Sequence, residues 1–464
     1  MATGSEGSAF TAALVEIVGG DHVVTGDAIA EDYTHDESLT VTPTAPGWLV
    51  RPAATDEVAA IVRAAGEHGV PITARGSGTG LSGACTPVAG GLVVSFERMA
   101  AILDVDLADH VAVVQPGVTL DQLDKALADL GLVYPVFPGE NSASLGGNVA
   151  TNAGGMRAVK YGVTRHQVLG LEAVLGTGEV IRTGGRFVKS TSGYDLTQLV
   201  IGSEGTLALV TEAILRLYPR PAHAATVLAP FRTLPEVTEA IPPIVGSGIG
   251  PLVLEYIDMI SMGGILGHAA LDLGIPETIK AEALAYLVIV LEDRTSDRLD
   301  EDVAELAELV AELGALDVYV LPPSAGTALI HARERSFWAA KAAGADDLVD
   351  TVVPRSRIPS YLSTVADLAQ AASALVVGCG HVGDGNVHLS VFQPDHEIRE
   401  RLVHDMLAAA VALGGAVSGE HGIGSEKRSH YTDLEDPVKL ELMGRIKDAF
   451  DPKGILNPNK VIAR

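Results

Sequence analysis

The sequence is poor in cysteine and in positive charge. Its two cysteines, Cys85 and Cys379, are too few for a disulfide framework or a thiolate zinc site. Such scarcity is typical of a reducing compartment, so we expect a cytoplasmic protein. Lysine and arginine number 32 against 59 aspartates and glutamates, which gives a formal net charge of −27. Because this charge repels nucleic acid and anionic lipid, it disfavours both as main partners.

The sequence also lacks a long apolar run. The longest, over residues 283–291, is well short of the roughly 18 residues that suggest a membrane-spanning helix. It therefore indicates an internal strand or helix, and we expect no transmembrane segment. A secretory signal begins with a basic segment followed by an apolar one. The first residues of this sequence do not show that pattern. Apolar residues make up 47% of the sequence and charged residues 20%, which indicates a globular protein.

Glycine, by contrast, is abundant, and its 51 residues are concentrated in the first half of the sequence. A strand over 48–51, a helix from Thr55 and a strand over 70–74 predict a βαβ start in this half. The glycine-rich sequence ends at Pro219-Arg-Pro221, where we place a domain boundary near residue 220. The 464 residues suffice for two or three domains.

The second half alternates strands and helices without a strict βαβ order. Helices are predicted most clearly over 300–313 and 437–450. This pattern predicts an antiparallel sheet with helices on one face, and an α+β fold class for the whole protein. The predicted strands of this half cover residues 225–230, 251–257, 286–291, 316–321, 347–353 and 374–392.

Four glycine-containing segments point to a dinucleotide. Gly78-Thr-Gly80-Leu-Ser-Gly83 matches the fingerprint G-x-G-x-x-G, but a strand rather than a helix is predicted to follow, which disfavours a Rossmann site. Consecutive backbone N–H groups in such a loop can still bind a pyrophosphate, and Arg75 adds positive charge. The other three segments, each of which alone is typical of a turn, are Pro116-Gly117, Ser144–Gly155 and Gly202–Thr206.

Together these segments resemble the FAD domain of the vanillyl-alcohol oxidase and p-cresol methylhydroxylase (PCMH) superfamily over residues 45–220. The resemblance implies a PCMH-type FAD-binding domain, preceded by a helical cap segment over 1–44. It also implies that the loop over 75–83 holds the pyrophosphate and that the other segments reach the rest of the cofactor. The loop has no histidine for a covalent flavin bond, so we expect non-covalent FAD. The implied cofactor-binding residues are Arg75, Gly76, Ser77, Gly78, Thr79, Gly80, Ser82, Pro116, Gly117, Pro138, Ser144, Gly146, Gly147, Asn148, Thr151, Asn152, Gly154, Gly155, Gly202, Glu204, Gly205, Thr206 and Asn457.

Two histidines lie on either side of a predicted hairpin turn in the second half. Asp384-Gly385 between two apolar strand halves is a strong signal for a two-residue turn. This turn would place His381 directly opposite His388, with Cβ atoms about 5 Å apart, so that both imidazoles can meet one ion. The alternative is that both are polar residues on a solvent-facing side of the strands.

A third ligand is available from Glu420, which lies between glycines in Val417–Gly424. Two histidines and one carboxylate leave coordination positions open for a substrate oxygen, as a divalent Lewis-acid site requires. This ligand set favours zinc, with manganese and iron as alternatives. His421 would be the general base, because the unperturbed pKa of histidine lies near neutral pH.

The second half narrows the resemblance. His381–His388, Gly419–Gly424 and Asn457–Lys460 are similar to the C-terminal motifs of FAD-linked D-2-hydroxyacid dehydrogenases, which include D-lactate dehydrogenase, the catalytic glycolate oxidase subunit and D-2-hydroxyglutarate dehydrogenase. The resemblance then covers nearly the whole sequence. It implies a substrate and metal domain of the FAD-linked oxidase C-terminal type over 221–464, whose tail from about residue 440 returns to the FAD domain.

The same resemblance implies roles for single residues. His381, His388 and Glu420 would hold the metal, His421 would act as base, and Asn386 would touch substrate. Arg333 falls where these relatives keep an arginine that binds the substrate carboxylate, a task that suits the guanidinium fork; a solvated helix arginine is the alternative.

The implied reaction is oxidation of a small 2-hydroxycarboxylate by hydride transfer to flavin N5. Hydroxyglutarate enzymes typically add a lysine before the segment Asp350–Pro354, whereas this sequence has Asp-Asp-Leu-Val over 346–349, so D-lactate or glycolate is favoured over D-2-hydroxyglutarate. Two rival functions are a non-catalytic flavin-binding subunit of a multi-subunit oxidase and an alkyl-dihydroxyacetonephosphate synthase. The electron acceptor (quinone, cytochrome or electron-transfer flavoprotein) and the oligomeric state, including a homodimer, stay open.

Overall fold

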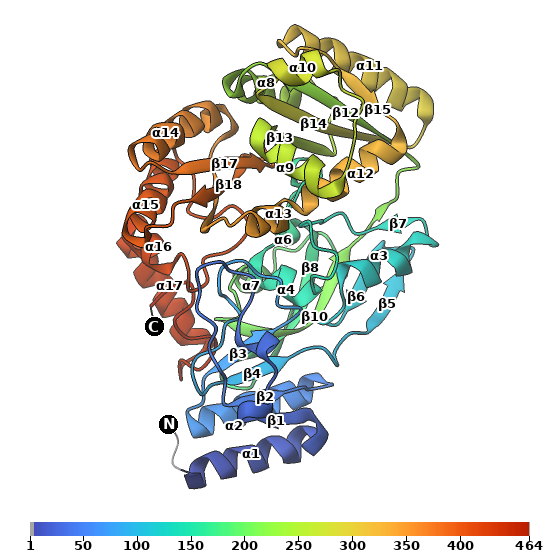
Figure 1. Ribbon diagram of the computed structural model, residues 1–464. Helices are drawn as coiled ribbons and strands as arrows, with labels where there is room; N and C mark the ends of the chain where they lie inside the picture. The colour runs from blue at the N-terminus through green and yellow to red at the C-terminus, as the bar shows by residue number, and fades with distance from the viewer. Residues whose placement is uncertain (1–3, 464) are drawn as a thin grey trace.

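The computed structural model describes residues 4–463, and it begins with helix α1 (Gly4–Val18). The first sheet lies next to α1 (Figure 1). Helix α2 (Thr55–His68) carries acidic residues in its first turn and ends at Gly69, which has a left-handed φ of 65°, as its sequence pattern predicts. It connects two strands of the parallel part of this sheet. The strand order is β1 (Val23–Thr25), β2 (Trp48–Val50), β4 (Leu92–Ser95) and β3 (Ile72–Arg75).

A second, antiparallel sheet of five strands completes the first half. Its core is formed with helix α3 (Leu120–Ala128), whose buried Leu120, Leu123 and Leu127 follow the helical period. Helix α4 (Leu145–Thr151) packs against the same core. The strand order is β5 (Ile102–Asp106), β6 (Val111–Val114), β10 (Ala208–Arg216), β8 (Val168–Leu175) and β9 (Val180–Gly184).

The second half is built on a seven-stranded sheet in which every pairing is antiparallel, as predicted. A short ribbon pairs β7 (Leu132–Val133) with β11 (Tyr218–Pro219), and β11 comes directly before this sheet in the sequence. The strand order is β15 (Tyr319–Leu321), β12 (His223–Phe231), β14 (Ala285–Asp293), β13 (Val253–Asp258), β17 (Leu375–Gly380), β18 (Asn386–Phe392) and β16 (Asp347–Val352).

The prediction that helices cover one face of this sheet is wrong. Alternate residues of β12 enter two different cores, Val227 and Ala229 on one side and Leu228 on the other. Both faces are therefore apolar, and each needs a layer of helices. One layer contains α8 (Leu234–Gly246), α11 (Ser296–Glu312), α14 (Ile358–Ala371) and α15 (His396–Ala412). The other contains α9 (Met259–Ala269), α10 (Glu277–Glu282), α12 (Pro323–Glu334) and α13 (Ser336–Ala342).

The C-terminal segment lies against the first half of the protein. Helices α16 (Arg428–Leu434) and α17 (Pro437–Phe450) lead back toward β3 and β4 (Figure 1). Leu456 then pairs with Ile72 as an isolated parallel bridge. The buried Lys447 amine donates to the carbonyl oxygens of Thr206 and Leu456, at 2.7 and 2.6 Å. The bridge fixes the tail to β3, the strand that precedes the glycine-rich loop, and the Lys447 bonds tie α17 to the Thr206 segment and to Leu456.

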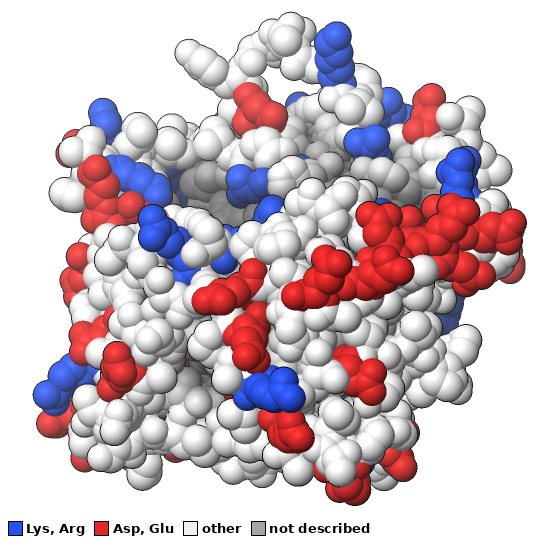
Figure 2. All heavy atoms as spheres, turned by 90° about the horizontal axis from the view of Figure 1, so that it is seen from above, with Lys and Arg blue, Asp and Glu red and all other residues white. Residues whose placement is uncertain are grey.

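The surface reflects the acidic composition. Figure 2 shows a band of aspartate and glutamate side chains across the end of the molecule where α8, α10 and α11 lie in Figure 1. Among the described residues, no helix combines the length and the apolar character needed to cross a bilayer.

Candidate functional site

The loop after β3 forms one wall of a groove in the first half. As predicted, it connects two strands rather than a strand and a helix. The backbone N–H groups of Gly78, Thr79 and Gly80 find no acceptor within residues 4–463, and all three residues line the groove. Unpartnered amides in succession are a binding site for an anion such as a pyrophosphate.

The opposite wall is the start of α4. Ser144 caps this helix by accepting from the Gly147 N–H at 3.3 Å, and it accepts from the Ser77 N–H at the same distance. A Cβ at Gly76 would overlap the Ser144 hydroxyl, so only glycine lets the two walls meet. The Asn148 side chain is 4% exposed, and its Nδ2 has no partner among the described residues. An orphaned donor facing a groove indicates a polar ligand.

Most of the predicted cofactor residues line this groove or an adjoining cavity. Pro116 and Gly146 line the cavity, which has a volume of about 60 Å³ and shares Gly76, Gly147 and Gly205 with the groove. The predicted residues in the groove are Gly76, Ser77, Gly78, Thr79, Gly80, Pro138, Ser144, Gly147, Asn148, Thr151, Gly154, Glu204 and Gly205.

Arg75 does not enter the groove, contrary to the prediction. Its Nη1 donates to the His35 carbonyl at 2.6 Å, and its guanidinium lies 5.4 Å from the centre of the Tyr33 ring. The side chain lies against Gly78, where a Cβ would overlap it. Arg75 therefore supports the loop from behind.

Seven other predicted cofactor residues are also absent from the lining of the groove and of the adjoining cavity. The Asn457 Nδ2 donates to the carbonyl oxygens of Ala84 and Glu204, at 2.9 and 2.7 Å, and so ties two groove segments together. The Ser82 hydroxyl donates to the His421 carbonyl at 3.1 Å. The remaining five, Gly117, Asn152, Gly155, Gly202 and Thr206, are absent from the lining and shape the backbone of these segments.

The predicted metal ligands meet in the second half. The Nε2 atoms of His381 and His388 lie 3.0 and 3.1 Å from the same Glu420 oxygen, Oε1. The two ring centres are 4.8 Å apart. A metal ion at this point would have two nitrogen ligands and one carboxylate, with positions left open.

Two buried carboxylates stand behind the histidines. Glu255 of β13 places Oε1 2.6 Å from His381 Nδ1, and Asp350 of β16 places Oδ1 3.6 Å from His388 Nδ1. These partners leave both Nε2 atoms directed at Glu420. A carboxylate behind a metal-binding imidazole fixes its orientation. The chemistry of the donor set therefore fits a divalent ion.

The hairpin that carries the histidines has a different register from the one predicted. Cys379, not His381, pairs with His388. The turn is a five-residue loop over 381–385, because the N–H groups of Asp384 and Asn386 both donate to the His381 carbonyl, at 3.1 and 3.2 Å. The shift moves His381 by two residues, and this keeps it on the His388 face of the hairpin. The imidazoles meet for that reason even though the predicted pairing is wrong.

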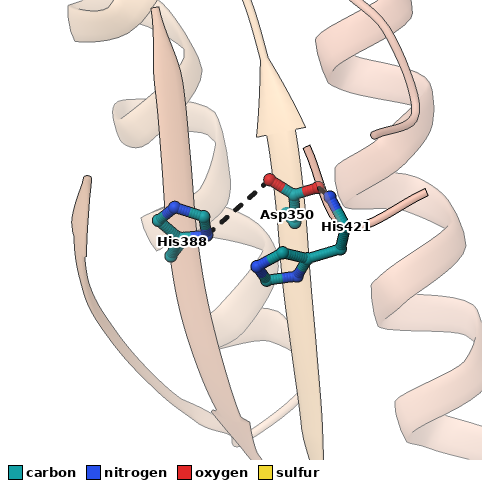
Figure 3. A group of neighbouring side chains, drawn as sticks. All are labelled: Asp350, His388 and His421. Atoms are coloured by element: carbon teal, nitrogen blue, oxygen red, sulfur yellow. Dashed lines mark hydrogen bonds and ion pairs between the residues drawn. The ribbon is translucent and has the colours of Figure 1, made fainter. Parts of the chain in front are cut away.

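Asp350 also organises the loop that carries Glu420 and His421. Its Oδ2 accepts from the N–H groups of Gly419, Glu420 and His421, at 3.0, 3.0 and 2.9 Å, and from the Ser418 hydroxyl at 2.7 Å. Figure 3 shows Asp350, His388 and His421 converging from β16, β18 and this loop. The His421 ring stacks on His388, with centres 4.9 Å apart. Burial lowers the pKa of His421 to about 4, so its imidazole is neutral at pH 7 and can accept a proton.

Arg333 is buried and faces the same cavity. Its Nη2 lies 2.7 Å from Glu255 Oε2, and its Nη1 donates to the Ser336 hydroxyl at 3.0 Å. Its Nε has no hydrogen-bond partner among the described residues, although the residue is only 5% exposed. This excludes the alternative of a solvated helix arginine, and a buried guanidinium with a free donor suits a carboxylate.

Asn386 does not face the cavity, contrary to the prediction. Its Nδ2 donates to Asp350 Oδ1 at 2.7 Å and to the Thr351 carbonyl at 2.8 Å. The first residue of β18 thus points toward β16, and it supports Asp350 rather than a ligand.

The groove and the cavity are continuous. The cavity has a volume of about 480 Å³ and contains Arg333 and the three metal-ligand candidates in its lining. Leu81, Pro138, Glu420 and His421 line both spaces. Glu420 and His421 therefore lie where the groove that would hold the flavin meets the cavity.

Two family models match the sequence. One, described as FAD binding domain, matches residues 46–184, and the other, described as FAD linked oxidases, C-terminal domain, matches residues 220–461. The chain belongs to the FAD-linked oxidases. It is an FAD-dependent oxidoreductase with a PCMH-type fold, in keeping with the predicted α+β class and the groove of the first half.

Its relatives cover nearly its whole length. An uncharacterized FAD-linked oxidoreductase of Mycobacterium tuberculosis is 58% identical over 454 residues, 98% of this chain and 99% of the relative. D-lactate dehydrogenase of Anaerostipes hadrus is 36% identical, over 95% and 94% of the two chains, and glycolate oxidase subunit GlcD of Bacillus subtilis is 35% identical, over 97% and 96%. Among solved structures, p-cresol methylhydroxylase superposes with a TM-score of 0.82 at 19% identity, over 99% and 98%, which shows the shared fold.

Sequence reasoning missed Glu255 and gave no role to Asp350. Each is a single carboxylate within an apolar strand segment, in Leu252–Ile257 and Leu348–Val353. Burying a charged side chain is costly unless it is paired. A single carboxylate in an apolar strand therefore indicates that a partner lies on the same face of the sheet.

Proposed function

We propose that this oxidoreductase converts a D-2-hydroxy acid into the 2-oxo acid. The observation that carries the proposal is the convergence of the His381, His388 and Glu420 cluster, the neutral His421 and the buried Arg333 on one cavity that continues into the flavin groove. Relatives named D-lactate dehydrogenase and glycolate oxidase subunit support it.

Arg333 and His421 have separate roles in this reaction. Arg333 binds the substrate carboxylate through its free donor, and its contact with Glu255 fixes the fork. His421 accepts the proton of the substrate hydroxyl, while Asp350 and Ser82 hold its backbone in place. Bound FAD supplies the hydride acceptor, and a divalent ion held by the cluster supplies Lewis acidity. General-base catalysis of this kind contributes about 10²- to 10⁴-fold to the rate.

The lining favours a monocarboxylate over a dicarboxylate such as D-2-hydroxyglutarate. Among the described residues that line the cavity, Arg333 is the one lysine or arginine. Leu348 lies in the lining close to where hydroxyglutarate enzymes are expected to place a lysine. A second carboxylate would be desolvated there without a cationic partner. The histidine pair and Glu420 also argue against a purely structural flavin subunit.

Anaerobic mixing with D-lactate or glycolate tests the proposal. We expect bleaching of the oxidised flavin band by the wild type and a loss of about 10²-fold or more in the bleaching rate for His421→Ala, with flavin and metal contents unchanged. His396→Ala, at an exposed position of α15, is the control and should bleach normally. Near-normal bleaching by His421→Ala would remove this residue as the base.

A further inference from the structure

The cavity extends far beyond the polar groups that a small hydroxy acid would use. Its volume of about 480 Å³ lies in the range of roughly 300–1,000 Å³ typical of sites for drug-sized ligands. Lactate and glycolate would occupy only the end near His421 and leave the remainder to water. The shape and lining of that remainder therefore carry information about the rest of the substrate.

The floor of the remainder is one face of the β17–β18 hairpin. From His388 outward, the pairs along this face are Val377 with Ser390 and Leu375 with Phe392. All four side chains line the cavity, whereas the intervening Leu389 and Val391 enter the core on the other side. Phe392 lies four residue steps of roughly 3.3 Å beyond His388, so the floor is about 13 Å long.

The walls beside this floor are mainly apolar, although Ser261 of α9 and Ser336 of α13 also line the cavity. Phe337 and Ala340 of α13 form one wall, and Ile260 of α9 contributes to the other. At Gly264 of α9, an added Cβ would meet nothing within 4 Å, so the space beside this helix is open. The charged members of the lining, Arg333, Glu334 and Glu420, are not among the hairpin and helix residues that form this far part.

Apolar side chains at the outer end stay partly in water. Leu375 is 48% exposed and Ile260 is 52% exposed. Both line the same cavity as Arg333 and His421. Exposed apolar surface that continues into a pocket is typical of a ligand-binding groove.

We propose that this channel holds the hydrocarbon tail of a D-2-hydroxy fatty acid of medium length. The proposal rests on the proposed function and adds the substrate class to it. The carboxylate and hydroxyl lie at Arg333 and His421, and the tail runs along β18 toward Leu375. The floor is about as long as the tail of 2-hydroxydodecanoate when extended.

The test measures binding of the 2-oxo products to the oxidised holoprotein by calorimetry, using pyruvate, 2-oxohexanoate and 2-oxododecanoate. Burial of methylene groups should tighten binding about fourfold each, roughly sixtyfold from pyruvate to 2-oxohexanoate. Leu375→Asp should weaken binding of 2-oxododecanoate by about tenfold or more, and its effect should grow with the length of the tail. Leu442→Asp on α17 is the matched control, because Leu442 is also 48% exposed but lies outside the cavity.

The outcomes separate this proposal from the proposed function. Length-dependent binding that Leu375→Asp weakens and Leu442→Asp does not would support the channel. Equal affinity for pyruvate and 2-oxododecanoate, or equal effects of the two variants, would overturn it. If the 2-oxo acids bind with the expected length dependence but no D-2-hydroxy acid bleaches the flavin anaerobically, the channel stands and the proposed function fails.

Discussion

Glu255→Gln should lower both the stability and the metal affinity of the protein. Glu255 is fully buried, and its two oxygens contact Arg333 and His381 at 2.7 and 2.6 Å. The arginine is only 5% exposed and the histidine 7%. A neutral amide would leave the buried guanidinium without a charge partner, and breaking such a pair typically costs about 3–5 kcal/mol. It would also loosen His381, which should weaken metal binding by about 10- to 100-fold.

Guanidinium-induced unfolding and metal analysis of dialysed protein measure the two effects. The matched control is Glu282→Gln, since Glu282 pairs with Arg232 at 3.2 Å, but both side chains are more than half exposed. An exposed pair contributes at most about 1 kcal/mol. If Glu255→Gln shifts the unfolding midpoint no more than Glu282→Gln and keeps its metal, then Glu255 does not act as the shared partner of Arg333 and His381.

Three further predictions concern the metal, the flavin and pH. His388→Ala should lose the bound divalent ion but retain flavin, and an unchanged metal content would exclude it as a ligand. Gly76→Ala should reduce the flavin-to-protein absorbance ratio, because the added Cβ would overlap Ser144. Gly246→Ala is the control and should keep the ratio, because the space around its added Cβ is open. Equal ratios for the two variants would contradict the role of Gly76 in the flavin groove. Burial raises the pKa of Asp347 to about 6, so the native state loses stability as pH rises from about 4 to above 6. Asp347→Asn should therefore be up to about 3 kcal/mol more stable than the wild type at pH 7.5, with little gain at pH 4. Equal gains at both pH values would show that the raised pKa of Asp347 is not the cause.

The sequence predicted those parts of the site that depend on local spacing. We could locate the loop between β3 and β4 and the Glu420-His421 pair from the sequence. Both lie next to glycines, whose effect on the backbone is local. The register of the hairpin could not be predicted, because it depends on the conformation of the loop that connects the two strands. The Asp384-Gly385 signal predicts two residues, but two N–H groups share the His381 carbonyl and close a longer loop.

Residues whose partners lie far away in the sequence were the hardest to interpret. Arg75 was expected to face the cofactor, but its acceptor is the carbonyl of His35, 40 residues earlier. Asn386 was expected to touch substrate, but Asp350 on the neighbouring strand takes its amide. In both cases a buried N–H donor is satisfied by an acceptor from a distant segment, and only the tertiary structure determines which acceptor that is.

We expect a divalent ion held by His381, His388 and Glu420 to serve the chemistry at the flavin. Anaerobic flavin bleaching by a D-2-hydroxy acid, measured before chelation, after chelation and after zinc or manganese is restored, tests it most directly. We expect bleaching before chelation, loss of bleaching after chelation with the flavin still bound, and recovery once the metal is restored. Bleaching that continues at the same rate in fully chelated protein would contradict it.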